Sequence, residues 1–196
     1  LVGLEDGADR WSVAALPAAL PKGAYRLADS TSPSDATAAA FAWAIGGYRF
    51  RRYKKPAEKA GDELARLVWP EEVDRAAIKR VVGAYALARD LINTPAEDMG
   101  PAQLADAVKA VARAHKAKCS VIVGEDLLAK NYPSVHTVGR ASTRPPRLID
   151  LSWGNSGPRL TLVGKGVCFD SGGLDLKPSS GMLLMKKDMG GAALML

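Results

Sequence analysis

Residues 163–173 read VGKGVCFDSGG, and two shorter stretches follow, LKP at 176–178 and KDMGGAA at 187–193. These stretches hold five charged side chains among glycines, and the candidate site residues are four of them: Lys165, Asp170, Lys177 and Asp188. Carboxylates are hard oxygen donors that suit Mn²⁺, Mg²⁺ or Zn²⁺, and glycines let the backbone approach an ion or a substrate closely. A bound cation also favours a neutral lysine amine as a ligand. The pattern therefore predicts a metal or anion site, and the alternative is a glycine-rich loop with solvated charges.

The residues around this segment predict strands before it and a helix after it. Apolar runs at 147–153 and 159–163 are typical of strands, and the turn GNSGP at 154–158 separates them. The second strand would place Lys165 at its carboxyl end, which is the edge where α/β sheets bind ligands. The closing sequence GGAALML at 190–196 predicts the start of a buried helix.

Helices and short strands also alternate further upstream. We expect, in order, a helix from a cap at Ser34 or Asp35 to Tyr48, a strand at 64–69, helices at 71–94 and from 101, a strand at 119–123 and a short helix at 125–130. This alternation predicts an α/β fold with a central mixed sheet flanked by helices, preceded by the remnant of a smaller α/β domain. We place the boundary at residue 70.

Bulk composition fits a soluble globular protein, because 47% of the 196 residues are hydrophobic and 24% are charged. No apolar run reaches the 18 residues that a membrane span needs, so none is expected. Cys119 and Cys168 give no disulfide framework and suit a reducing cytosol. The sequence opens on Leu1 rather than Met and closes on an apolar run, so we expect a fragment of a longer protein.

Basic residues are concentrated in YRFRRYKK at 48–55, and the whole chain carries a net charge of +6. Basic side chains interleaved with aromatic ones are able to contact nucleic acid or an anionic surface. The alternative is a helix end whose arginines pack along their stems and keep their charged groups in water. We favour this second interpretation, because composition alone is weak evidence for nucleic-acid binding.

Other catalytic motifs do not fit the sequence. Gly166 stands where a phosphate-binding P-loop requires Ser or Thr, and no His-Glu-x-x-His zinc helix exists, because His115 and His136 are the only histidines. Cys168 has no histidine nearby in the sequence to activate it, so we expect a buried, inert thiol.

The charged glycine-rich segment resembles the metal-binding and catalytic segment of the leucyl (cytosol) aminopeptidase family. The resemblance covers residues 163–193 almost throughout. It continues upstream in ARDLINTP at 88–95, VGRAS at 138–142 and PRLIDL at 146–151. It extends from about Tyr48 onward, while the first forty residues resemble the family's variable N-terminal domain loosely.

The resemblance implies a role for each matching residue. Lys165 would ligate the more tightly held of two metal ions, Asp170 would bridge both ions, and Asp188 would be a further ligand of the tight site. Lys177 would be the catalytic lysine near the scissile carbonyl, and Met185 would line the pocket for the first side chain of the substrate. All five residues are therefore expected to surround the substrate.

The family implies hydrolysis of the N-terminal residue, with a leucine-type preference, from peptides that have a free N-terminus. Two divalent ions, Mn²⁺ or Zn²⁺, would activate the water, Lys177 would stabilise the oxyanion, and bicarbonate would be an auxiliary base. The resemblance also implies a cytoplasmic homohexamer. Residues 1–70 would be a partial N-terminal domain. Residues 71–196 would be a linking helix and the first part of the catalytic domain, inactive alone because further ligands lie downstream.

Two alternatives to this function remain open. One is a DNA-binding regulatory role, as in some bacterial relatives, for which the basic residues at 48–55 are the only local support. The other is a catalytically dead scaffold, which would follow if the complete protein lacked the downstream carboxylate ligands.

Overall fold

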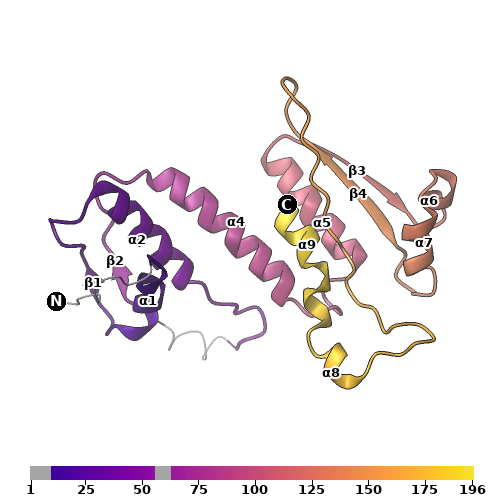
Figure 1. Ribbon diagram of the computed structural model, residues 1–196, viewed down its shortest axis with the longest axis horizontal. Helices are drawn as coiled ribbons and strands as arrows, with labels where there is room; N and C mark the ends of the chain where they lie inside the picture. Colours follow the sequence, from indigo (N-terminus) through magenta and orange to yellow (C-terminus); the bar gives the residue numbers. More distant parts are fainter. Residues whose placement is uncertain (1–9, 56–62) are drawn as a thin grey trace. The chain divides into compact units, whose positions relative to one another are not determined.

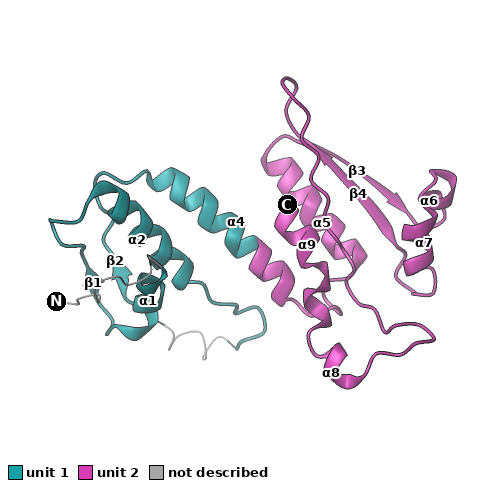
Figure 2. Ribbon diagram, in the orientation of Figure 1, with its two compact units in different colours: residues 1–87 teal, residues 88–196 magenta. Residues whose placement is uncertain are grey.

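The computed structural model describes residues 10–55 and 63–196, and it divides into two compact units, residues 1–87 and 88–196 (Figure 2). The change from one unit to the other falls inside helix α4 (Arg75–Asn93). The predicted domain boundary at residue 70 stays a prediction. No helix among the described residues is long and apolar enough to cross a membrane.

Unit 1 is built around the alanine-rich helix α2. Its described elements are, in chain order, the 3-10 helix η1 (Arg10–Ala15), α1 (Leu16–Ala19), β1 (Ala24–Tyr25), α2 (Pro33–Gly46), β2 (Arg66–Leu67) and the first part of α4. The Ser32 hydroxyl caps α2 by accepting a hydrogen bond from the Asp35 amide at 3.2 Å. The helix therefore begins earlier than the predicted cap at Ser34 or Asp35, because Pro33 is well suited to the first helical position.

Small side chains let the elements of unit 1 pack closely. Ala39, Ala42 and Trp43 on α2 form one buried cluster with Val13, and a second buried cluster joins α2 to Ile78 on α4. A side chain at the last residue of α2, Gly46, would overlap the backbone of η1, so only glycine fits at this crossing. The two short strands β1 and β2 pair in parallel.

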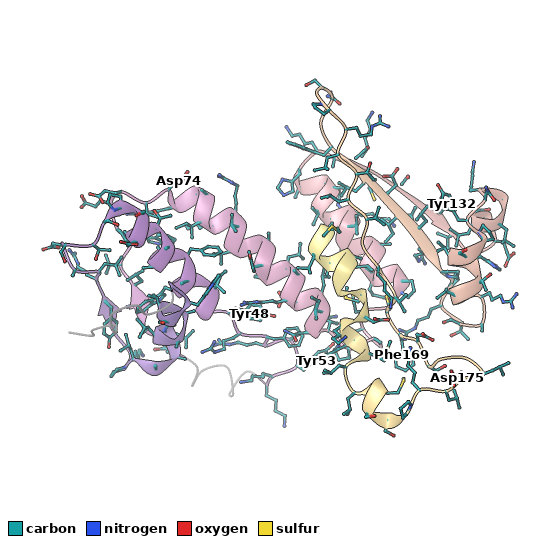
Figure 3. All side chains as sticks on the ribbon, in the orientation of Figure 1. Tyr48, Tyr53, Asp74, Tyr132, Phe169 and Asp175 are labelled. Atoms are coloured by element: carbon teal, nitrogen blue, oxygen red, sulfur yellow. The ribbon has the colours of Figure 1, made fainter. Side chains whose placement is uncertain are left out.

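Helix α4 begins later than the sequence predicts. The Asp74 carboxylate accepts a hydrogen bond from the Ala77 amide at 2.9 Å and so caps the first turn, and Figure 3 labels Asp74 at this end of the helix. The prediction of a helix starting at Glu71 was wrong by one turn, because the side chain of Asp74 satisfies the free amides there. The predicted strand at 64–69 shortens to β2.

Unit 2 contains an antiparallel pair of strands covered by a helix (Figure 1). Its elements after α4 are α5 (Pro101–Ala114), β3 (Lys118–Val123), α6 (Asp126–Ala129), α7 (Pro133–Gly139), β4 (Arg147–Ser152), α8 (Ser179–Met182), the 3-10 helix η2 (Met185–Met189) and α9 (Gly190–Met195). Val121 lies opposite Ile149 in the β3–β4 register. Helix α5 packs against this pair and buries Leu104, Ala105 and Val108.

The predicted α/β class is confirmed, and the predictions of α5, β3, α6 and β4 are confirmed to within one or two residues. The predicted strand at 159–163 was wrong: this segment is irregular, and Leu160 and Val163 are 81% and 86% exposed. No described strand pairs with it, and a strand requires such a partner for its backbone hydrogen bonds. The final helix α9 is buried only in part, because Ala193 is buried whereas Leu194 is 67% exposed.

Candidate metal and catalytic site

A tight loop between Asp170 and Lys177 forms the first half of the site. The Asp170 carboxylate accepts a hydrogen bond from the Gly172 amide at 2.8 Å, and the Lys177 amide donates to the Ser171 carbonyl at 2.9 Å. Gly172 has φ +93°, and a side chain there would overlap the Asp175 carbonyl. Glycine is therefore required for this turn. Figure 3 labels Asp175 in the loop.

The Lys177 ammonium bonds to the aspartate at the other end of this loop. Its Nζ donates to Oδ2 of Asp170 at 2.7 Å and to the Asp170 carbonyl at 3.0 Å. This hydrogen bond is the main reason why the pKa of Asp170 lies below its ordinary value, and the Gly172 amide contributes next. The positive charges of Lys177 and Lys165 lower this pKa further, while partial loss of solvent opposes them. Asp170 is therefore held ionised.

The second half of the site is an ion pair between Lys165 and Asp188, whose Nζ and Oδ2 atoms lie 2.8 Å apart. Close backbone packing brings them together. A side chain at Gly164 would come within 2.5 Å of the Gly191 carbonyl, and the Ala192 amide donates to the Lys165 carbonyl at 2.9 Å. Glycines on both segments therefore allow residues 164–165 to lie directly against the first turn of α9.

The structure thus arranges the four charged residues as two ion pairs, Lys165 with Asp188 and Lys177 with Asp170. The charge of Lys165 acts on Asp170, so the two pairs share one electrostatic environment. The predicted position of Lys165 at the end of a strand was wrong, because the segment before it is irregular. Contacts with α9 position this lysine instead.

The donor set fits a divalent cation in part. Asp170 and Asp188 offer carboxylate oxygens, and Lys165 would offer an amine if it lost its proton. Within residues 10–55 and 63–196, however, no three of the His, Cys, Asp and Glu side chains converge on one point. The described residues therefore supply some of the ligands that two ions would need, and the assignment of metal ligands stays a prediction.

Two further residues singled out from the sequence are buried. Met185 is 7% exposed and lies one turn before Asp188 in η2, and its predicted place in a substrate pocket stays a prediction. Cys168 donates weakly to the Gly166 carbonyl, and burial raises the pKa of its thiol to about 11, although the charge of Arg144 lowers it slightly. This pKa agrees with the expected inert thiol.

The basic segment at 48–55 follows the carboxyl end of α2. Arg49 donates to the carbonyls of Gly46 and Tyr48 at 3.1 and 2.8 Å, and the Arg52 guanidinium lies 5.7 Å from the centre of the Tyr53 ring. A cation that binds the last carbonyls of a helix is a common helix end. These contacts support the helix-end interpretation, and a nucleic-acid role stays a hypothesis.

Sequence reasoning missed the contact that positions Lys165. The glycine pair at 190–191 was visible as a signal for close approach, but its partner Gly164 lies too far along the chain to be matched by local pattern. Sequence reasoning also missed Arg144, which donates to the carbonyls of Ala96 and Glu97 at 2.9 Å and to the Glu97 carboxylate at 2.7 Å. No local motif marks such an arginine.

The fold is that of solved aminopeptidases. Cytosol aminopeptidase from Coxiella burnetii is 48% identical and matches with a TM-score of 0.86, covering 95% of this chain and 40% of that chain. Leucyl aminopeptidase from Trypanosoma cruzi is 30% identical and matches with a TM-score of 0.76, covering 94% of this chain and 38% of that chain. A Bottromycin maturation enzyme, BotP, was solved in complex with Mn. It is 37% identical and matches with a TM-score of 0.73, covering 94% of this chain and 41% of that chain.

Sequence comparison identifies the family. The catalytic domain of the cytosol aminopeptidase family matches residues 86–196, and the M17 aminopeptidase N-terminal domain matches residues 1–70. The probable cytosol aminopeptidase of Rhodococcus jostii is 35% identical over 185 residues, which is 87% of this chain and 37% of that relative. The chain therefore belongs to the cytosol aminopeptidase family, and the resemblance noted in the sequence is confirmed. It spans well under half the length of these relatives.

Proposed function

We propose that this chain is part of a metal-dependent aminopeptidase that removes the N-terminal residue from peptides. Membership of the cytosol aminopeptidase family is the observation that carries this proposal. The paired lysines and aspartates support it, because they gather ionised carboxylates and ammonium groups at a glycine-built site. The names of the relatives further favour a cytoplasmic enzyme.

Asp170 and Asp188 would hold divalent ions through their carboxylate oxygens, and Lys165 would ligate through a neutral amine. Such ions, when bound, lower the pKa of a water molecule and polarise a carbonyl. Mn²⁺ is our first choice of metal, since BotP was solved with Mn, and Zn²⁺ is the second. The loop geometry at Gly172 keeps Asp170 ionised and fixed in orientation, which is what a carboxylate ligand needs.

Lys177 would act on the reacting carbonyl. Its side chain is 33% exposed and is held by two hydrogen bonds to Asp170, so the ammonium is fixed beside a predicted metal ligand. A fixed cation at this place would stabilise the oxyanion of a tetrahedral intermediate. Met185 would set the leucine-type preference, with bicarbonate as an auxiliary base and a homohexamer as the assembled form.

A reconstitution assay tests this proposal. Release of leucine from leucine amide would be measured with Mn²⁺ for the chain alone and for the chain mixed with the downstream part of the catalytic domain. We expect no activity from the chain alone, because its described carboxylates are too few for two ions. Activity from the chain alone would contradict this expectation, and a mixture that binds Mn²⁺ but stays inactive would favour a catalytically dead scaffold.

A variant pair tests the role of Lys177 in the reconstituted enzyme. Lys177→Met should lower kcat by about 10²–10³-fold, the usual effect of losing one oxyanion donor. Lys130→Met is the matched control, because Lys130 is an exposed lysine at the end of α6 in the same unit. An unchanged kcat in Lys177→Met would remove this lysine from the proposed chemistry.

A further inference from the structure

Exposed apolar side chains of unit 2 are concentrated in its last part. Eleven of the fourteen exposed large hydrophobic residues of this unit lie within residues 153–196, although residues 88–152 form the larger part of the unit. Leu174 is fully exposed, and Phe169, which Figure 3 labels, is 58% exposed. Single exposed apolar side chains are normal on a protein surface, whereas a large group of them marks an interaction surface.

Within this part, residues 159–163 have the features of a strand without a neighbour. All five residues of the sequence RLTLV are exposed, including Leu160, Leu162 and Val163. None of their amides donates a hydrogen bond to a backbone carbonyl in the described part of the chain. The segment is fixed at its end, because the next residue, Gly164, packs against the backbone of α9. Free backbone groups beside apolar side chains are what an added strand binds.

Two observations indicate which polypeptide covers this segment. The chain spans well under half the length of its relatives, and the match to their catalytic domain runs to residue 196. The candidate site directly after the segment is also short of ligands, because no three His, Cys, Asp or Glu side chains converge within the described ranges. A polypeptide that brings further ligands to Lys165 must pass close to residues 159–163. A second copy of this chain would not supply that downstream sequence.

We propose that residues 159–163 form a β-strand by pairing with the downstream part of the catalytic domain. The proposal rests on the proposed function, since it takes the partner to be the rest of the same enzyme. Pairing would give the free amides carbonyl partners. Because side chains alternate along a strand, Leu160 and Leu162 would lie on one face of the enlarged sheet and Val163 on the other. The downstream part would then bury apolar surface beside the site that it completes.

Hydrogen exchange of the 196-residue chain, measured with and without the separately produced downstream polypeptide, tests the proposal. The amides of Leu160, Thr161, Leu162 and Val163 should exchange at least about tenfold more slowly in the mixture, because strand pairing protects them. The amides of helix α7 should exchange at unchanged rates. Association without slower exchange at 160–163 would overturn the proposal, and so would a failure of the two polypeptides to associate.

A pair of valine variants tests the surface by affinity. Val163→Asp should weaken association by about tenfold or more, because a charged group would be buried in place of an apolar one. Val138→Asp is the matched control, since Val138 is 70% exposed on α7 in the same unit, and it should change the affinity less than about twofold. Equal weakening by both variants would count against this surface. Circular dichroism checks folding. If Val163→Asp does not fold, Thr161→Pro replaces it, because proline removes an amide that the pairing needs.

The same mixture separates this proposal from the proposed function. A complex that protects residues 160–163 but releases no leucine from leucine amide supports the pairing and contradicts the peptidase activity. An active complex with unprotected residues 160–163 supports the activity and overturns the pairing. Sedimentation of the chain alone tests the competing occupant. If the chain dimerises and protects residues 160–163 without the downstream polypeptide, a second copy covers this segment and the proposal is overturned.

Discussion

Replacing Gly164 by alanine should separate the segment that carries Lys165 from the first turn of α9. The new Cβ would lie 2.5 Å from the Gly191 carbonyl oxygen and 2.6 Å from the Ala192 Cα. Both contacts are with backbone atoms, so one segment must move. Overpacking of this kind costs about 1–3 kcal/mol. Loss of the hydrogen bond from the Ala192 amide to the Lys165 carbonyl adds about 0.5–1.5 kcal/mol. We therefore expect Gly164→Ala to lower the free energy of unfolding by about 2–4 kcal/mol.

Urea unfolding measures the global effect, and amide hydrogen exchange at Ala192 measures the local one. Gly190→Ala is the matched control, because a Cβ at Gly190 would make only ordinary contacts, 3.5 Å and longer, with Ile92. The Gly164→Ala variant should unfold at a lower urea concentration than the control, with an unchanged m-value. The amide hydrogen of Ala192 should exchange with solvent faster in this variant than in the control. If the two variants unfold at the same urea concentration and protect Ala192 equally, glycine packing does not position Lys165.

Three further predictions follow from individual hydrogen bonds and from burial. Lys177→Met should raise the pKa of Asp170 toward its ordinary value, as an NMR titration of the carboxyl carbon would show. A carboxyl whose pKa is lower in the folded state stabilises the fold above its unfolded-state pKa, and this stabilisation is lost as pH falls through the folded-state pKa. The variant lacks this contribution, so its free energy of unfolding should fall less below about pH 4 than that of the unsubstituted chain. The Cys168 thiol, with its pKa raised to about 11, should react with iodoacetamide at about pH 8 roughly a hundredfold more slowly than in the unfolded chain. Its raised pKa should also make stability fall as pH rises from about 9 to about 11, which urea unfolding at each pH would show. Ser32→Ala should cost about 1 kcal/mol in urea unfolding through loss of the α2 cap, whereas Ser30→Ala, at an exposed position, should change little.

The helices were predictable because their signals are local. Helix α5 begins at Gly100-Pro101 as expected, since proline at the first helical position leaves no amide unsatisfied. The start of α4 was misplaced because Glu71 and Asp74 are both plausible first-turn residues, and only the structure shows that Asp74 bonds to the Ala77 amide. Local sequence thus predicts that a helix exists more reliably than it predicts which side chain caps it.

Strands depend on residues that are distant in sequence, and this separates the correct prediction of β4 from the wrong one at 159–163. Both segments carry apolar residues in a pattern that fits a strand. Each residue of β4 is paired with β3, as Val121 with Ile149 shows, whereas no strand in the described part of the chain lies along 159–163. Strand propensity reflects how well side chains pack on a neighbouring strand, so an apolar pattern alone does not show whether such a strand is present.

For the site as well, the sequence predicted the residue types but not their geometry. Sequence identified the lysines and aspartates, but it did not indicate that Lys177 would pair with Asp170 and Lys165 with Asp188. Each carboxylate lies within 2.8 Å of an ammonium, so the formal charges of the four groups cancel without any cation. A divalent ion bound to these oxygens would compete with the ammonium groups for them. Lys165 is 61% exposed and holds one bond to its partner, whereas Lys177 is 33% exposed and holds two. Lys165 is therefore the ammonium whose displacement breaks fewer contacts, and the Lys165–Asp188 side of the site is where metal binding would disturb the fewest existing interactions.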